Sequence, residues 1–290
     1  MTGEAELKIA RRDFAKRITS AVRVTDTRIE DAFADVRRED FLGPGPWPVF
    51  DLPSGGYVPS ADADPIHLYT DDLFGISPDR QINNGQPTLH AYLLGCAKLQ
   101  EGEHAVHVGA GVGYYSAIMA HLVGPSGRVT AIEFEPDLAA RARANFAAHA
   151  NVTVVEGDGS VAAFSAADVI YVNAGATRPA DAWLDRLKDG GRLILPLTTD
   201  KGFSVDDLAN MQRRGAVFLI TRTGETFQAR WIAPVAIYPC AGMRDEASEK
   251  ALVSAFQKED VRRVTRLYRT GDIPDERCWL KAPDWCLAYD

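Results

Sequence analysis

Three glycines at alternate positions are the residues of this chain best placed to do chemistry, because together they can form a binding turn. Gly109, Gly111 and Gly113 follow the strand-like residues 106–108 and precede an apolar stretch of helical character. Glycine lets the main chain turn sharply and approach a ligand, and the amides that open the next helix can bind it. The segment predicts a strand, a tight turn and a helix, with a nucleotide-like ligand at the carboxyl end of the strand.

An acidic residue after the turn narrows the type of ligand. Glu133 lies near the end of the apolar segment 128–134, 24 residues after Gly109. A carboxylate at such a position can accept both hydroxyl groups of a ribose. NAD-binding folds prefer G-x-G-x-x-G, whereas the spacing here is G-x-G-x-G and position 114 is tyrosine. The turn therefore favours S-adenosylmethionine over NAD, and a purely structural glycine-rich turn is the alternative.

The composition favours one enzyme core with appendages. The chain has 290 residues, of which 46% are hydrophobic and 25% charged, enough to bury one large α/β core. Its net charge of −8 disfavours a duplex nucleic-acid partner, because phosphate binding draws on clustered lysine and arginine. No uncharged apolar stretch reaches about 18 residues and no signal peptide is recognisable, so we expect a cytoplasmic enzyme without a membrane partner.

The cysteines and histidines do not predict a metal site. Cys96, Cys240, Cys278 and Cys286 show no C-x-x-C spacing, and the six histidines are scattered without the spacing of metal ligands. We expect no bound metal, and we expect the four cysteines to be reduced thiols that are mostly buried.

The elements that must position the glycine turn alternate between strands and helices. Further strands are expected at residues 128–133, 152–155, 169–172 and 193–197, the last after a turn at Gly190 and Gly191. Helices are expected at residues 114–122, 136–149 and 180–187. Residues 217–221 and 227–232 predict an antiparallel closing pair. This order predicts an α/β fold with a doubly wound, mainly parallel sheet.

The region before this core is expected to begin with helices and continue without regular elements. Residues 4–22 and 27–36 predict two helices. Residues 43–65 contain six prolines, which we interpret as a long surface excursion. A helix from Thr88 predicts five core residues at helical spacing: Leu89, Tyr92, Leu93, Cys96 and Leu99. In the C-terminal extension, Trp279 and Trp285 are expected to pin the chain onto the sheet. The expected domains are 1–88, 89–238 and 239–290.

The order of several motifs resembles that of the protein-L-isoaspartate O-methyltransferases. The stretch DAFADVRREDFLGP is similar to their ALxxVPRExF signature, and INNGQPTLHAYLL is similar to their TISQPYMVAxM segment. The segments VHVGAGVGYYSAIMAHLVG, VTAIEFEPDLAARARANF, NVTVVEGDG, DVIYVNAGA and LKDGGRLILPL follow in the family's order, so the resemblance covers roughly residues 29–238. It implies a class I S-adenosylmethionine-dependent methyltransferase with a seven-stranded Rossmann-like sheet, and S-adenosylhomocysteine as product.

The resemblance also implies roles for residues around the cofactor. Gly109, Gly111 and Gly113 would line the methionine part, Glu133 would bind the ribose, and Asp158 would accept from the adenine amino group. The predicted cofactor-binding residues are Gly109, Ala110, Gly111, Gly113, Tyr114, Glu133, Asp158 and Gly159. For Ala110 only the main chain would take part, and for Tyr114 a packing role is the alternative.

Two positions depart from the family pattern. His107 stands where the family has an acidic residue, either as a locally bonded strand-end histidine or as a cofactor contact. Asn83, Asn84 and Gly85 replace the hydroxyl of the TISQP segment, with one apparent extra residue. A carboxylate acceptor needs no general base at neutral pH, because it is already ionised. We predict that Asn83 and Asn84 orient it through their amide groups, and the alternative is that Asn84-Gly85 forms only a tight turn.

The implied activity is carboxyl O-methylation of isoaspartyl or aspartyl residues in proteins or peptides, as in protein repair. A methyltransferase of the same fold acting on a small molecule or a dedicated peptide is a second hypothesis, favoured by the altered loop, the proline-rich excursion and the extension. A degenerate, non-catalytic cofactor-binding or interaction module is a third. A nucleic-acid methyltransferase is disfavoured by the acidic charge balance.

Overall fold

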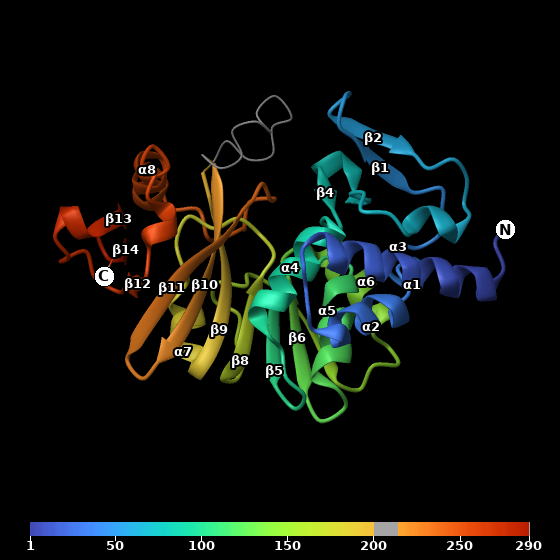
Figure 1. Ribbon diagram of the computed structural model, residues 1–290, viewed down its shortest axis with the longest axis horizontal. Coiled ribbons are helices and arrows are strands. Elements are labelled where there is room, and N and C mark those ends of the chain that lie inside the picture. The colour runs from blue at the N-terminus through green and yellow to red at the C-terminus, as the bar shows by residue number, and fades with distance from the viewer. Residues whose placement is uncertain (200–213, 290) are drawn as a thin grey trace. The chain divides into compact units, whose positions relative to one another are not determined.

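The computed structural model describes residues 1–199 and 214–289, and its chain forms two compact units (Figure 1). Unit 1 comprises Met1–Glu103 and Ala110–Gly157, and unit 2 comprises His104–Gly109 and Asp158–Asp290. The chain passes from unit 2 back to unit 1 inside the glycine turn. The predicted domain boundaries after residues 88 and 238 stay predictions.

Unit 1 begins with the two predicted helices. They are α1 (Glu4–Ala21) and α2 (Thr27–Asp35), which pack against each other and are followed by the short α3 (Glu39–Leu42). The Asp26 carboxylate accepts a hydrogen bond from the main-chain N–H of Arg28, which satisfies a free donor at the start of α2. The expectation for this region is therefore confirmed.

The proline-rich segment contains a hairpin, so the prediction that residues 43–65 lack regular elements is wrong. Strands β1 (Pro48–Asp51) and β2 (Gly56–Pro59) pair antiparallel, with Phe50 opposite Tyr57. The two rings pack edge to face with their centroids 5.4 Å apart, and this cross-strand contact stabilises the hairpin. The prolines of these strands lie at the strand ends, where they are tolerated. The turn-rich stretch that follows contains η1 (Pro65–Leu68), β3 (Gly75–Ser77), η2 (Pro78–Arg80) and β4 (Ile82–Asn83).

Helix α4 (Pro87–Ala97) forms as predicted but buries a different face. Leu93 and Leu99 are buried, whereas Leu89, Tyr92 and Cys96 are only half-buried, so the predicted core set is wrong for these three. The helix faces the interior instead with Pro87, His90, Ala91, Leu94 and Ala97. Both faces satisfy helical spacing, and most of this helix is apolar, so periodicity alone does not choose between them.

The remaining elements of unit 1 surround the glycine turn. They are α5 (Tyr114–Val123), β6 (Arg128–Glu133), α6 (Pro136–Asn145) and β7 (Val152–Glu156). Strands β6 and β7 pair in parallel, with Glu133 opposite Glu156. Helix α6 ends at Asn145 instead of reaching His149, so its predicted end is wrong, and the Phe146 ring that follows packs against Gly113.

The sheet of unit 2 runs in the order β13-β14-β12-β11-β10-β9-β8-β5. Its strands are β5 (His104–Val108), β8 (Ala167–Val172), β9 (Leu187–Thr198), β10 (Gly215–Thr223), β11 (Thr226–Pro234), β12 (Arg266–Tyr268), β13 (Cys278–Lys281) and β14 (Cys286–Ala288). Strands β5, β8 and β9 are parallel, and the strands from β10 onward pair antiparallel, as expected for β10 and β11. The short α7 (Asp181–Arg186) precedes β9.

The predicted turn at Gly190 and Gly191 lies inside β9, so the strand begins earlier than residue 193. Gly190 has a φ of +73°, and the pairing of β9 with β8 shifts register across this region, from Ala167 opposite Leu187 to Val169 opposite Arg192. A glycine in this conformation makes a bulge within the strand rather than a separate turn.

The C-terminal extension adds α8 (Glu246–Ala255) and strands β12 to β14 to unit 2 (Figure 1). Trp279 is fully buried and packs 5.6 Å from the Phe218 ring and 5.4 Å from the Phe256 ring. Trp285 is also buried and donates to the Ser248 hydroxyl. Trp279 therefore pins the extension onto β10 as expected, whereas Trp285 contacts α8 within the extension and its expected contact with the sheet stays a prediction.

Candidate cofactor and substrate site

In unit 1 the glycine turn is bonded to the end of β6. The Gly111 N–H donates to Oε2 of Glu133 at 2.6 Å, and the Ala110 N–H donates to the Ile132 carbonyl at 3.1 Å. The Gly113 N–H closes the turn on the Ala110 carbonyl at 3.0 Å. Four of the predicted cofactor-binding residues are therefore in direct contact within this unit.

Two of the glycines are required by their conformation and their neighbours. Gly113 has a φ of +98°, and a Cβ there would lie 2.4 Å from the Phe146 ring. In unit 2, Gly109 has a φ of +75°, and its Cβ would lie 3.1 Å from the Asn173 carbonyl oxygen. A larger residue would deform the turn at either position, so glycine keeps the main chain in the shape that a closely bound ligand needs.

Glu133 is buried at the start of the β6–α6 connection, with 5% of its surface exposed. Its Oε1 accepts from the Glu135 N–H at 2.9 Å, in addition to the bond from Gly111. Burial raises its pKa, and the main-chain hydrogen bonds partly oppose that rise. A carboxylate offers about four acceptor sites, so part of this capacity remains for ribose hydroxyl groups beside the main-chain donors. The residue fits the predicted role.

In unit 2, Asp158 and Gly159 lie beside the end of β5. Gly159 packs so closely on Val108 that a Cβ would lie 2.4 Å from Cγ1 of that valine, and its carbonyl accepts from the Trp183 indole at 2.8 Å. Asp158 accepts from the Ser160 N–H at 2.8 Å. Its carboxylate keeps further acceptor sites for an adenine amino group.

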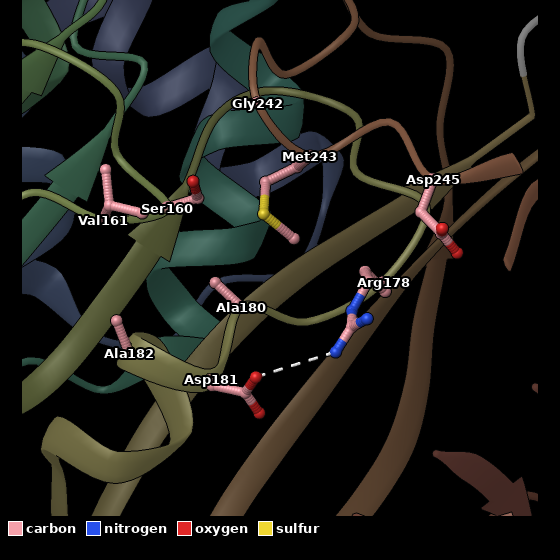
Figure 2. A pocket seen from close by; sticks show the side chains of 9 residues that line it. All are labelled: Ser160, Val161, Arg178, Ala180, Asp181, Ala182, Gly242, Met243 and Asp245. Atoms are coloured by element: carbon pink, nitrogen blue, oxygen red, sulfur yellow. Dashed lines mark ion pairs between the residues drawn. The ribbon is translucent and has the colours of Figure 1, made fainter. Parts of the chain in front are cut away.

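The extension reaches the predicted adenine acceptor, which no sequence signal indicated. Gly242 adopts a φ of +76° and lies so close to Asp158 that a Cβ would be 2.1 Å from Oδ2. Residues on both sides of this contact line a pocket of about 560 Å³, shown in Figure 2: Ser160, Val161, Arg178, Ala180, Asp181, Ala182, Gly242, Met243 and Asp245. The extension therefore shapes the surroundings of Asp158 in unit 2.

Arg178 on the pocket wall makes two ion pairs. Arg178 lies 3.7 Å from Asp181, as drawn in Figure 2, and 2.8 Å from Asp284 of the extension. Asp245 caps α8 by accepting from the Ser248 N–H at 2.7 Å. Arg178 thus joins the extension to the segment after β8.

His107 is a buried, neutral residue of β5. Its ring is fully buried and meets the Tyr171 ring edge to face at 5.5 Å, and desolvation lowers its pKa to about 3. A neutral imidazole cannot replace the charge of the acidic residue usual at this position. This geometry supports the local structural role that the sequence left open for His107.

Residues 75–86 of unit 1, called the substrate loop below, contain Asn83 and Asn84, which have different surroundings. Oδ1 of Asn83 accepts from the Gly85 N–H at 2.9 Å, and its amide donates to the Tyr57 hydroxyl at 3.3 Å. Asn84 is 6% exposed, and its amide nitrogen is buried without a hydrogen-bond partner among the residues that the structure describes. Asn83 shapes the turn, whereas Asn84 keeps a donor free. A buried donor without a partner is unfavourable, so it indicates a position that a ligand can satisfy.

Contacts from α4 and α5 fix this loop. The Tyr115 hydroxyl donates to the Gly85 carbonyl at 3.0 Å, and the His90 ring stacks on Tyr115 at 3.5 Å. Earlier in the loop, the Ile76 side chain approaches Gly111 so closely that a Cβ on that glycine would be 3.0 Å from Ile76 Cδ1. The loop therefore lies against the glycine turn within unit 1.

Two arginines tie the same loop to α6. Arg80 pairs with Glu135 at 2.5 Å and with Asp137 at 2.6 Å, and the hydrogen bond from Arg80 is the main cause of the lowered pKa of Asp137. Arg141 donates to the Ile76 carbonyl at 2.8 Å. Arg80 had no sequence signal, because it lies in a turn-rich stretch without periodicity.

Tyr114 is enclosed in an aromatic cluster of unit 1. Its ring lies 6.3 Å from Phe33 and 5.9 Å from Phe41, and the Arg38 guanidinium lies 5.6 Å from it. Its hydroxyl is buried without a partner among the described residues. A packing role is evident from these contacts, and a cofactor contact stays a prediction.

A glycine turn bonded to an acidic residue at the next strand end, with parallel strands on both sides of the connection, is typical of S-adenosylmethionine-dependent methyltransferases. The model of the protein-L-isoaspartate(D-aspartate) O-methyltransferase family matches residues 51–227 of the chain. The chain therefore belongs to this family, and S-adenosylmethionine is its cofactor.

Individual relatives agree with the family match. A protein-L-isoaspartate O-methyltransferase of Ignicoccus hospitalis is 39% identical over 157 residues, which cover 53% of this chain and 69% of the relative. Protein-L-isoaspartate O-methyltransferase 2 of Archaeoglobus fulgidus is 35% identical over 179 residues, which cover 56% and 82% of the two chains. A solved protein-L-isoaspartate O-methyltransferase structure has a TM-score of 0.64 at 25% identity, covering 80% of this chain and 66% of that one. The α/β, Rossmann-like methyltransferase fold is confirmed.

The described residues hold neither a metal-binding cluster nor a membrane-spanning helix. Residues 1–199 and 214–289 contain no group of three or more histidine, cysteine or acidic side chains placed to hold a metal ion. Within the same ranges, no helix combines the length and the apolar character needed to cross a membrane.

Proposed function

We propose that this chain transfers a methyl group to the side-chain carboxylate of an isoaspartyl residue in a protein or peptide. The family match and the names of the relatives support this acceptor. The net charge of −8 also supports a protein or peptide over a nucleic acid, and the cytoplasm stays our expected location. Among residues 1–199 and 214–289, no specific contact favours a small-molecule acceptor or a non-catalytic role.

S-adenosylmethionine supplies an electrophilic methyl group on a sulfonium sulfur. In unit 1, the remaining acceptor capacity of the buried Glu133 carboxylate supports its predicted role as partner of the ribose hydroxyls. In unit 2, the carboxylate of Asp158 supports the predicted contact with the adenine amino group. The main chain at Gly109, Ala110, Gly111 and Gly113 would hold the methionine part.

The buried amide of Asn84 is the observation that carries the proposed acceptor chemistry. This amide nitrogen is a buried donor that has no hydrogen-bond partner among the described residues. The loop that carries it lies against Gly111 through Ile76. We assign it to the acceptor carboxylate, which is ionised at neutral pH and needs orientation rather than a base. Good alignment of reacting groups can contribute on the order of 7–11 kcal/mol. Asn83 acts through the Gly85 turn and is a positioning residue.

A methyl-transfer assay with two peptides tests the proposal. The peptides have the same sequence and differ only in carrying isoaspartate or aspartate at one position, and the readout is base-labile radioactive methyl from S-adenosylmethionine. We expect transfer to the isoaspartyl peptide and little to its partner. Asn84→Ala is expected to lower kcat at least tenfold, with the affinity for S-adenosylhomocysteine unchanged, because one orienting hydrogen bond is lost.

Asn84→Ser is the matched control, because it restores a hydroxyl donor of the kind the family uses. It is expected to retain more activity than Asn84→Ala. Equal turnover by Asn84→Ala and the unmodified chain would remove Asn84 from the mechanism. Tight binding of S-adenosylhomocysteine without methylation of either peptide would show that the acceptor is wrong and the cofactor site right.

A further inference from the structure

Two cysteines of the extension are in contact within one hairpin of unit 2. Strands β13 and β14 pair antiparallel, with Cys278 opposite Ala288 and Lys281 opposite Cys286. Residues opposite each other, and residues two apart on one strand, share a face of a sheet, so both thiols point to the same side. Their Sγ atoms are 2.9 Å apart, and the residues are 2% and 0% exposed.

We propose that Cys278 and Cys286 are a disulfide-forming pair, with glutathione disulfide as the oxidant. A disulfide bond is about 2.05 Å long, so the sulfur atoms need to approach by roughly 0.9 Å. Trp279 lies at an irregularity in the strand pairing and changes the spacing between the two positions. A small rotation of the cysteine side chains is therefore sufficient, without a change of strand register.

Two lysines lie beside the hairpin that carries this pair. Lys258 donates to the carbonyl of Cys278 at 3.0 Å and to that of Trp279 at 2.8 Å. The pKa of Lys281 is raised, mainly by its hydrogen bond with Asp275, and electrostatic interaction with both cysteines contributes in the same direction. The nucleophile in thiol–disulfide exchange is the thiolate, so exchange at this pair requires one cysteine to lose its proton.

The exchange balances with one molecule of oxidant. One cysteine releases its proton to solvent, and its thiolate attacks a sulfur of glutathione disulfide, which expels one glutathione thiolate. The second cysteine loses its proton and attacks the protein sulfur of the mixed disulfide, which expels the second glutathione thiolate. Two protein thiols are oxidised by two electrons in total, and the two expelled thiolates take up the released protons.

A bond between Cys278 and Cys286 would cross-link strands β13 and β14, whose connecting turn contacts the pocket wall. The turn between the strands carries Asp284, which pairs with Arg178 at 2.8 Å, and Trp285, which donates to Ser248 at 3.2 Å. Strand β13 is the outermost strand of the described sheet in unit 2, and such edges open more readily than central strands. Opening of the edge gives the oxidant access, and closure of the bond then restricts the loop in the unfolded chain.

Mass spectrometry of the full chain in glutathione buffers of increasing oxidation tests the pair directly. Samples are quenched in acid, denatured and alkylated, and the alkylated thiols are counted and mapped. We expect the oxidised chain to lose about 2 Da, to protect Cys278 and Cys286 from alkylation, and to recover both thiols in dithiothreitol. We also expect its melting temperature to rise by about 5 °C.

Variants separate this pair from the other cysteines. Cys278→Ser and Cys286→Ser should each abolish the bond and the temperature shift, whereas Cys96→Ser should retain both. Alkylation of all four cysteines after the most oxidising treatment would overturn the proposal. A bond joining other cysteines, or glutathione adducts alone, would overturn it equally.

Discussion

Replacing Glu133 by glutamine is expected to weaken the binding of S-adenosylhomocysteine by about 10- to 150-fold. The carboxylate is buried and already accepts from Gly111 at 2.6 Å and Glu135 at 2.9 Å. Glutamine offers only one acceptor oxygen, so its amide group must face a main-chain N–H or a ribose hydroxyl. Each lost hydrogen bond to a charged acceptor is worth about 1.5–3 kcal/mol, which gives this range.

Isothermal titration calorimetry with S-adenosylhomocysteine measures the effect. Glu156→Gln is the matched control, because Glu156 lies opposite Glu133 on β7, is 41% exposed and makes a surface ion pair with Arg143. It should bind within about twofold of the unmodified chain, since exposed ion pairs contribute little. A folded Glu133→Gln variant with unchanged affinity would refute the assignment of the ribose to Glu133.

The raised pKa of Glu133 adds a test by pH. Its protonated form loses an acceptor, so affinity for S-adenosylhomocysteine should fall as pH decreases through the raised pKa of Glu133. The free energy of unfolding should change with pH in the opposite direction to the affinity. An acid whose pKa is raised in the folded state stabilises that state at low pH, and this contribution is lost as the pH rises through the folded-state pKa. Glu133→Gln should lack the pH dependence of binding, and a variant that keeps it would assign the titration to another group.

Three further predictions concern groups around the site. Burial lowers the pKa of His107 to about 3, so its contribution to the free energy of unfolding should be complete above about pH 6.5 and decline as the pH falls below that value. In chemical denaturation, His107→Phe should remove about 1.4 kcal/mol of this decline per pH unit. Arg80→Ala should raise the peptide KM about fivefold with little change in melting temperature, and Asp137→Asn, which removes one of its two ion pairs, should do less. Gly113→Ala should destabilise the chain by about 2 kcal/mol in urea denaturation, because its Cβ meets Phe146.

Local signals were sufficient to predict the central elements. The glycine turn, the strand ending at Glu133 and the antiparallel pair β10–β11 follow from residue types that act within a few positions of one another. The motif order also identified the family correctly. In α4, by contrast, several faces are apolar, and only the surrounding structure decides that Leu94 is buried and Leu89 is not.

The contacts that complete the site join positions far apart in the chain. Arg80 reaches Asp137, and Gly242 reaches Asp158, without any motif that marks either pair. The different surroundings of Asn83 and Asn84 likewise depend on Tyr57, which belongs to a hairpin hidden in a proline-rich segment. Composition predicts turns there, but cross-strand packing determines that two strands form.

A crystal structure with S-adenosylhomocysteine bound tests the central claim most directly. The account predicts the homocysteine part against the main chain of residues 109–113, the ribose hydroxyls within hydrogen-bond distance of Glu133, and the adenine amino group at Asp158. A ligand bound away from Gly111 and Glu133, or crystals that bind none at saturating concentration, would contradict it.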